Sequence, residues 1–262
     1  PVIRAMDAIE GGWPDPVYAH VPLIHGPDGA KMSKRHGAVG VEAYRDEEGV
    51  LPEALFNYLL RLGWGHGDRE EISRDEAIEL FDLDGVGKGP ARFDIKKLQN
   101  LNGHYIREAD DERLADIVAD RIGENADRAL LAEAMPVLKT RARSMNELAE
   151  GAGFLFATRP LQMTDKAAGL LDDEARARLA GLSEMLHVQN DWTIEALEAT
   201  TKAYAEQLEL GLGKLAQPMR AALTGTTTSP GIFDVLVLLG KEESLLRIDA
   251  QAASPAGTEE NE

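Results

Sequence analysis

The sequence predicts a mainly α-helical protein with one short β segment near its N-terminus. Two observations predict this fold class. From about residue 109 onward, apolar residues recur every three or four positions, which is the spacing of an amphipathic helix. Ser73 and Ser144 are each followed by a glutamate three positions later, a pattern that begins helices. Only residues 17–24 resemble a strand, so we expect helices to build almost all of the core.

The first predicted region spans residues 1–108 and combines this strand with helices. Asp94 suits the N-cap of the last helix, which we expect to end before Asn102 and Gly103. The glycine-rich run 84–90 contains one lysine but lacks the Gly-Lys-Ser/Thr of a phosphate-binding loop, so we interpret it as a plain connection. The predicted helices cover residues 1–10, 41–44, 52–61, 74–81 and 95–101.

The third of these helices, residues 52–61, has a predicted apolar side. The roles of two aromatic residues, one in this helix and one just after it, are open. Leu55, Leu59 and Leu62 are predicted to share one face. Tyr58 and Trp64 either stack on RNA bases or belong to the core, and aromatic residues in helical regions more often belong to the core. We therefore expect both aromatic side chains to be buried.

The rest of the chain is predicted to form two helical subdomains, residues 109–165 and 166–251, followed by a disordered polar tail, residues 252–262. The polar stretch 158–166 is interpreted as the linker between them. Pro136 should kink its helix or end it early. The predicted helices cover residues 110–122, 126–139, 145–154, 172–187, 193–210, 214–223, 230–239 and 242–249.

Composition narrows the functional classes. The 262 residues are 44% hydrophobic, which is enough to bury two or three small cores. The absence of cysteine excludes disulfides and thiolate zinc sites and fits the reducing cytoplasm. No apolar run approaches the roughly 20 residues of a membrane span. A formal net charge of −18 opposes a general basic nucleic-acid surface, so any RNA contact must depend on a few placed side chains.

The segment 26–38 is the most distinctive stretch of the chain. It places three cations and a hydroxyl, Lys31, Ser33, Lys34 and Arg35, between glycine-bearing flanks. Cationic side chains on such a loop can neutralise charge on phosphoryl oxygens. A solvated basic turn is the alternative, and the spacing alone leaves both open.

Residues 31–35, KMSKR, followed by HGA, resemble the KMSKS signature of class I aminoacyl-tRNA synthetases, and the extension resembles the glutamyl-tRNA synthetase subgroup. Further matching motifs occur in order along nearly the whole chain. They are LPEAL at 51–55, LGW at 62–64, FD at 93–94, LNG at 101–103, QPMRAALTG at 217–225 and LGKE at 239–242.

The resemblance implies a domain organisation. Residues 1–108 would hold the KMSKS loop and the stem-contact region, and the two helical subdomains would bind the anticodon. The N-terminal Rossmann-type catalytic domain is expected to be absent, because no histidine here has glycine two residues later, as that domain's signature requires. We therefore expect a C-terminal portion that begins just before the loop and does not aminoacylate tRNA by itself.

The resemblance also implies chemistry. The intact enzyme would join L-glutamate to tRNA(Glu) with ATP and Mg²⁺, through glutamyl-adenylate, and no metal site on this chain is expected. Lys31 and Lys34 would stabilise the departing pyrophosphate as the catalytic pair. The implied ATP-binding residues are Lys31, Met32, Ser33, Lys34 and Arg35.

Four cations in the helical half are candidates for tRNA contact. Arg141 and Arg143 lie where the family places anticodon-reading arginines, and Lys214 and Arg220 lie about two helical turns apart; ordinary helix charges are the alternative. We expect a cytoplasmic monomer that binds tRNA(Glu); whether it also binds tRNA(Gln) is left open by the sequence. The alternative function is a non-catalytic helical module, binding tRNA or protein, with a relic KMSKS loop.

Overall fold

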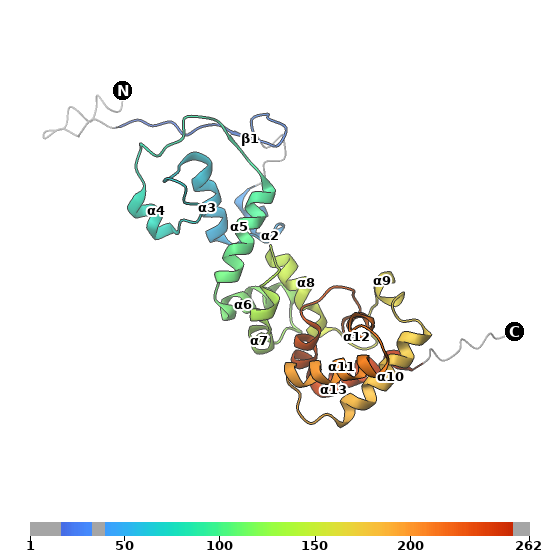
Figure 1. Cartoon of the computed structure of the whole chain (residues 1–262). Helices are drawn as coiled ribbons and strands as arrows, with labels where there is room; N and C mark the ends of the chain where they lie inside the picture. The colour runs from blue at the N-terminus through green and yellow to red at the C-terminus, as the bar shows by residue number, and fades with distance from the viewer. Residues whose placement is uncertain (1–16, 33–39, 254–262) are drawn as a thin grey trace, which may run out of the picture. The chain divides into compact units, whose positions relative to one another are not determined.

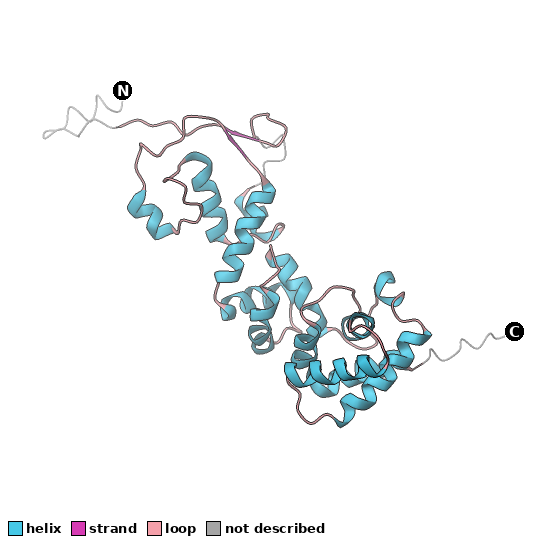
Figure 2. Ribbon diagram, in the orientation of Figure 1, coloured by secondary structure: helices cyan, strands magenta, loops and turns pink. Residues whose placement is uncertain are grey.

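The structure is a computed structural model that describes residues 17–32 and 40–253. These residues divide into two compact units: the first holds 17–32, 40–47 and 52–101, and the second holds 48–51 and 102–253. Within the described residues, helices are joined by loops and the only sheet has two strands, so the mainly α fold class is confirmed (Figure 2). The predicted helix over residues 1–10 lies outside the described residues. The predicted division of residues 109–251 into two subdomains stays a prediction.

The first unit contains a minimal parallel sheet. Strand β1 is shorter than predicted: it covers Ile24–His25, and residues 17–23 have no regular structure. Its partner is β2 (Ala91–Arg92), where the Ala91 N–H donates to the Leu23 carbonyl at 3.0 Å. Because β2 offers only two residues for pairing, it limits the length of β1. The helices of this unit are α2 (Val41–Asp46), α3 (Pro52–Gly63), α4 (Arg74–Leu80) and the first part of α5 (Ile95–Glu108) (Figure 1).

Aromatic residues contribute to the core of this unit. Tyr58 and Trp64, for which the sequence leaves RNA stacking or core packing open, are among them. Tyr58 packs edge-on against Phe93, with ring centroids 5.2 Å apart, and its hydroxyl donates to the Asp94 carbonyl at 3.0 Å. The Trp64 indole N–H donates to the Asp82 carbonyl at 3.0 Å. Both aromatic side chains are buried, as expected for core residues.

The predicted apolar face of α3 is partly wrong. Leu55 is buried, but Leu59 is 42% exposed. The buried face instead includes Ala54 and Asn57, whose side-chain amide donates to the Glu70 carbonyl at 3.0 Å. A buried asparagine with a hydrogen-bond partner is compatible with a core, so hydrophobicity alone did not identify this face.

Two predicted N-caps of the first unit are confirmed. Ser73 caps α4 in a complete capping box: its hydroxyl accepts from the Glu76 N–H at 3.2 Å, and its own N–H donates to the Glu76 carboxylate at 2.9 Å. Asp94 caps α5 by accepting from the Lys96 N–H at 2.9 Å and the Lys97 N–H at 3.3 Å. The glycine-rich run 84–90 is a connection, as interpreted, between α4 and β2.

Helix α5 does not end before Asn102 and Gly103, as predicted, but continues to Glu108. The Asn102 side chain is fully buried and makes tertiary hydrogen bonds instead of ending the helix: its carbonyl accepts from the Leu51 N–H at 2.8 Å, and its amide donates to the Arg143 carbonyl at 2.7 Å. Gly103 serves close packing, because an added Cβ would lie 3.3 Å from the Ala142 carbonyl oxygen. Tertiary contacts therefore override the local stop signal.

Among the described residues of the second unit, the regular secondary structure is helical and loops connect the helices. Pro136 lies inside α7, which ends only two residues later, and Thr193 caps α11. Helices α10, α11 and α13 pack side by side (Figure 1). The helices of this unit are α6 (Asp111–Ile122), α7 (Arg128–Leu138), α8 (Met145–Phe156), α9 (Asp165–Ala168), α10 (Asp173–Val188), α11 (Ile194–Gln207), α12 (Gly213–Thr224) and α13 (Ile232–Ala252).

Helix α13 is broken at Gly240, which has φ 73° and therefore a backbone conformation that suits glycine. The predicted boundary between helices at residues 239 and 242 corresponds to this break. Next to the break, the Leu236 carbonyl accepts from the Trp192 indole N–H at 2.9 Å and from the Ser244 hydroxyl at 3.2 Å. The Ser244 hydrogen bond therefore connects the second half of the helix to the first.

Candidate functional site

The first candidate site begins at the turn that follows β1. The Met32 N–H donates to the Ile24 carbonyl at 2.9 Å, and Lys31 pairs with His25 in an isolated antiparallel bridge. Gly29 has φ 79°, which permits the tight reversal between them. The turn thus ties the backbone of Lys31 to the strand and leaves its side chain exposed. Of the predicted loop residues, Ser33, Lys34 and Arg35 lie outside the described residues.

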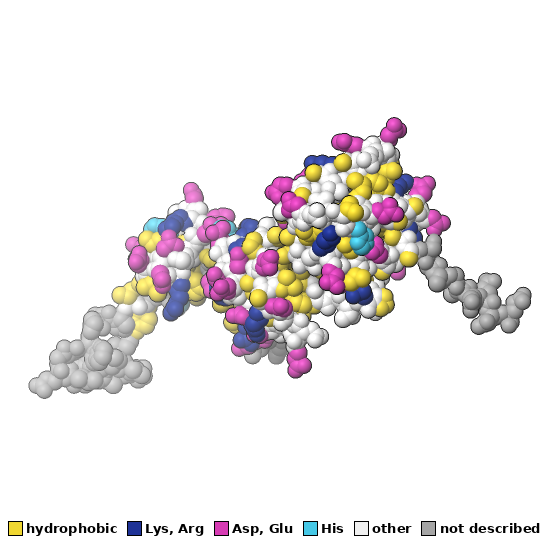
Figure 3. Space-filling model, turned by 90° about the horizontal axis from the view of Figure 1, so that it is seen from below, with side chains coloured by type: hydrophobic (Ala, Val, Ile, Leu, Met, Phe, Trp, Pro, Cys, Tyr) yellow, Lys and Arg dark blue, Asp and Glu magenta, His cyan; other side chains and the backbone are white. Residues whose placement is uncertain are grey.

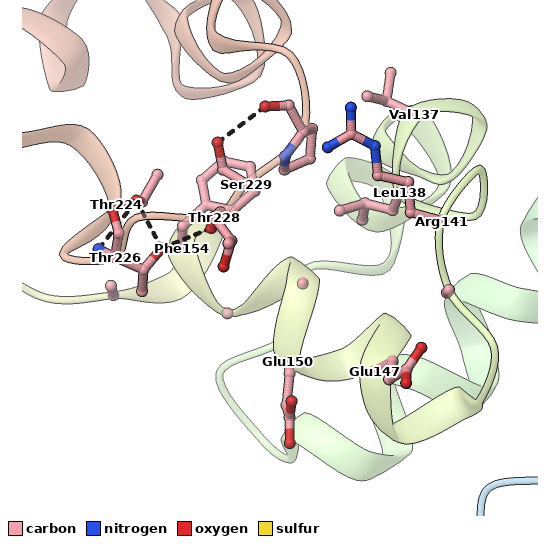
Figure 4. Close-up of a pocket in the computed structure, with 15 residues that line it drawn as sticks. Val137, Leu138, Arg141, Glu147, Glu150, Phe154, Thr224, Thr226, Thr228 and Ser229 are labelled. Atoms are coloured by element: carbon pink, nitrogen blue, oxygen red, sulfur yellow. Dashed lines mark hydrogen bonds between the residues drawn. The ribbon is translucent and has the colours of Figure 1, made fainter. Parts of the chain in front are cut away.

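The second candidate site is a pocket of about 710 Å³ in the second unit. Three segments line it: the end of α7 with the following turn (137–142), helix α8 (147–157) and the connection from α12 to α13 (224–230) (Figure 4). Phe154 and Pro230 contribute apolar surface, while Thr226 and Ser229 contribute hydroxyls. The pocket therefore offers both apolar surface and hydrogen-bonding groups.

One of the predicted tRNA-contact residues, Arg141, lines this pocket, and a second, Arg220, contacts a residue of its wall. Arg141 lines it and is exposed, and its side chain points toward the segment that carries Ser229 (Figure 4). Arg220 is half-buried and donates from Nε to the Ser229 hydroxyl at 2.7 Å. Burial first, and then the charge of Arg141, lower the pKa of Arg220. Within the described residues, neither guanidinium forms an ion pair with a carboxylate. The arrangement provides two charged donors suited to an anionic or base-edge ligand.

The other two predicted contact residues do not line the pocket. The Arg143 side chain is exposed, while its backbone is held by Asn102 and by the Glu147 carboxylate, which accepts from the Arg143 N–H at 2.8 Å. Lys214 is exposed in the first turn of α12. Its position is roughly 120° around the helix from that of Arg220, so the two do not share a face.

Several pocket residues were missed by sequence reasoning. The sequence predicts a helix from Pro230, but α13 begins at Ile232 after Gly231, and the Ser229 hydroxyl accepts from Arg220. Phe154 enters the prediction only as the end of a helix. The run of threonines from 224 to 228 was the available signal, because hydroxyls in a glycine-containing connection favour side-chain hydrogen bonds over helix.

The face drawn in Figure 3 has no broad basic patch. Acidic side chains are spread over it, with lysines and arginines between them. This agrees with contact through a few placed cations. No group of three or more His, Asp or Glu side chains in the described ranges is arranged to hold a metal ion. Among the helices described, none is long and apolar enough to cross a membrane.

Comparison with known proteins places these sites in a family. The family model "Anticodon binding domain" matches residues 106–252, and "tRNA synthetases class I (E and Q), catalytic domain" matches residues 5–100. Glutamate–tRNA ligase 1 of Erythrobacter litoralis is 77% identical over 96% of this chain and 52% of its own length. The chain belongs to the glutamate–tRNA ligase family of class I aminoacyl-tRNA synthetases.

Two further members of the glutamate–tRNA ligase family extend the comparison. Glutamate–tRNA ligase 2 of Novosphingobium aromaticivorans is 66% identical over 96% of this chain and 53% of its own length. A crystal structure of a glutamate tRNA ligase from Elizabethkingia meningosepticum, in complex with its amino acid, is 29% identical, with a TM-score of 0.78 over 92% of this chain and 52% of that one. The chain thus spans about half the length of the curated relatives it matches. The pocket lies within the region that matches the anticodon-binding domain.

Proposed function

We propose that this chain supplies the tRNA-binding portion of a glutamate–tRNA ligase, and that the whole enzyme joins L-glutamate to tRNA(Glu) with ATP through glutamyl-adenylate. One observation carries the proposal: Arg141 lines a pocket inside the region that matches an anticodon-binding domain, and Arg220 donates to Ser229 in the wall of that pocket.

The pocket has the groups that single-stranded RNA requires. A guanidinium can donate two parallel hydrogen bonds to a base edge or phosphate, and it can stack on a base. Phe154 and Pro230 offer apolar surface for an unstacked base, and the Ser229 hydroxyl can exchange its Arg220 partner for a ligand. We propose Arg141 and Arg220 as the principal tRNA contacts, with Arg143 and Lys214 as outlying ones.

The loop would act on ATP in the whole enzyme. We propose that Lys31 and Lys34 stabilise the pyrophosphate as it leaves, Lys34 most directly, while Met32, Ser33 and Arg35 hold the loop against the nucleotide. The step needs charge stabilisation and positioning rather than a nucleophile from this chain. Mg²⁺ would arrive bound to the ATP phosphates, as it does where few protein carboxylates are available.

The partners follow from this role. The proposed substrates of the whole enzyme are ATP, L-glutamate and tRNA(Glu), with tRNA(Gln) as a further substrate if the pocket accepts both anticodons. The proposed enzyme is a cytoplasmic monomer.

Titration of the chain with tRNA(Glu), and with the same tRNA carrying a changed anticodon, tests the proposal. At two salt concentrations, we expect tighter binding of the native anticodon and a shallow salt dependence, because base contacts release few counterions. The matched variant is Arg141→Ala, which should reduce the preference for the native anticodon. Equal weak binding of both RNAs that disappears with salt would contradict anticodon reading and favour the non-catalytic module.

A further inference from the structure

A buried arginine lies behind the pocket and joins its walls. Arg247, in the second half of α13, has a side chain that is 2% exposed. Its Nη1 donates to the carbonyls of Phe154 and Leu223, both at 2.8 Å, and its Nη2 donates to the Ala157 carbonyl at 3.0 Å. One guanidinium therefore holds backbone groups from α8 and from α12.

The three carbonyls that accept from Arg247 lie at the C-terminal ends of helices. Phe154 lies in the last turn of α8, Ala157 is its C-cap, and Leu223 lies in the last turn of α12. Carbonyls in the last turn of a helix have no partner within the helix, and the C-terminus carries partial negative charge. A buried cation that donates to two such ends satisfies both and fixes their separation.

The same helix ends line the pocket. Phe154 and Ala157 belong to its α8 wall, and Thr224, next to Leu223, belongs to the opposite wall. The buried charge is balanced by Glu243, whose carboxylate accepts from Arg247 Nε at 2.7 Å and lies 3.3 Å from Arg159 Nε. Arg247 itself does not line the pocket.

We propose that Arg247 is a positioning residue that sets the separation of the α8 and α12 ends, and through it the shape of the pocket that holds Arg141. The part of this inference that concerns RNA rests on the proposed function. The geometric part does not, so the two can fail separately.

Distance measurement between two spin labels tests the geometric part. The sequence contains no cysteine, so cysteines placed at Glu150 and Thr228, which are exposed and on opposite walls, label the chain at those two positions alone. In Arg247→Met, we expect the distance distribution to shift or broaden, because methionine keeps the apolar stem but donates to no carbonyl.

The matched control is Arg128→Met. Arg128 is exposed on α7, pairs with Asp116 and Asp120, and does not line the pocket, so its distribution should match that of the unsubstituted chain. An unchanged distribution in folded Arg247→Met would overturn the inference. If Arg247→Met does not fold, Arg247→Lys replaces it: lysine keeps the charge but lacks the planar fork, so a smaller shift is expected and no shift overturns the inference.

A second experiment, titration with RNA, tests whether Arg247 affects recognition of the anticodon. The unlabelled chain is titrated with a stem-loop RNA that carries the glutamate anticodon and with one that carries a changed anticodon. We expect Arg247→Met to reduce the ratio of the two affinities about tenfold, equivalent to about 1.4 kcal/mol, and Arg247→Lys to restore part of it. A retained ratio in Arg247→Met would overturn the positioning role. Absence of any preference in the unsubstituted chain would contradict the proposed function, and the label distances would still decide the role of Arg247.

Discussion

Arg220 and Arg141 are electrostatic neighbours on different segments: burial first, and then the positive charge of Arg141, lower the pKa of the Arg220 guanidinium. Arginine side chains carry a positive charge at neutral pH. Two like charges held together in this way repel each other until an anion or a base carbonyl lies between them. The pair is therefore poised to gain from binding of a negatively charged ligand.

We predict that Arg141→Gln and Arg220→Gln each weaken tRNA(Glu) binding by about 1–3 kcal/mol. Because the two side chains would share a ligand, the double variant should lose less than the sum of the single losses. Equilibrium titration of the four proteins measures this, with Arg128→Gln as the control. Additive losses, or losses no larger than that of the control, would show that the arginines do not act on one ligand.

Lys34→Ala, made in the whole ligase, should lower the rate of ATP–pyrophosphate exchange by about 100-fold, as loss of one charge-stabilising donor does in other enzymes. The proposed tRNA contacts are on other residues, so tRNA affinity should stay unchanged. Lys88→Ala, in the glycine-rich connection, is the matched control and should leave exchange intact. An unchanged exchange rate in Lys34→Ala would remove this lysine from the proposed mechanism.

Asn102→Ala should destabilise the second unit strongly. The substitution leaves the buried Leu51 N–H and the Arg143 carbonyl without their partner, at about 1–3 kcal/mol for each buried group left unpaired. Urea unfolding measures the loss. Asn100→Ala, on the exposed side of the same helix, is the control and should change stability by less than about 0.5 kcal/mol. Equal effects of the two variants would mean that the Asn102 hydrogen bonds contribute nothing net.

The capping box of α4 predicts a pH dependence. Hydrogen bonds from the Ser73 backbone, then from its side chain, and then from Arg69 lower the pKa of Glu76 below its ordinary value of 4.5. The folded state therefore favours the carboxylate: its stabilisation is complete above pH 4.5 and is lost as the pH falls through the lower, folded-state pKa. Hydrogen exchange of α4 amides, compared between the unsubstituted chain and Glu76→Gln, should show a protection difference that narrows below pH 4.5. A difference independent of pH would contradict the linkage.

Local chemistry made most of the helix starts predictable. Ser73, Asp94 and Thr193 cap helices through contacts within three residues, which a short stretch of sequence contains in full. The Ser144 box is only half right: its hydroxyl accepts from the Glu147 N–H, but the Glu147 carboxylate accepts from the Arg143 N–H instead of the Ser144 N–H. The Ser-x-x-Glu spacing is the same whether the glutamate accepts from the serine N–H or from that of the preceding residue, so the sequence does not distinguish the two.

Long-range contacts account for what could not be predicted. The helix stop at Asn102 was wrong because the partners of that side chain come from Gly49, Leu51 and Arg143, which no local window contains. The candidate pocket had the same limitation. Arg141 and Arg220 were selected from composition and motif, but only the tertiary structure brings them together beside Ser229. Their role in tRNA binding stays a prediction.

The turn after β1 has a consequence for how Lys31 would engage a ligand. Its backbone is already tied to the strand by the bridge to His25 and by the Met32 hydrogen bond, so ordering this lysine requires no further backbone entropy. Only the side chain remains to be ordered, at up to about 2 kcal/mol of rotamer entropy. Lengthening the turn by a flexible insertion at Asp28 would add a backbone term to that amount, and the affinity for a polyphosphate would fall without the loss of any contact.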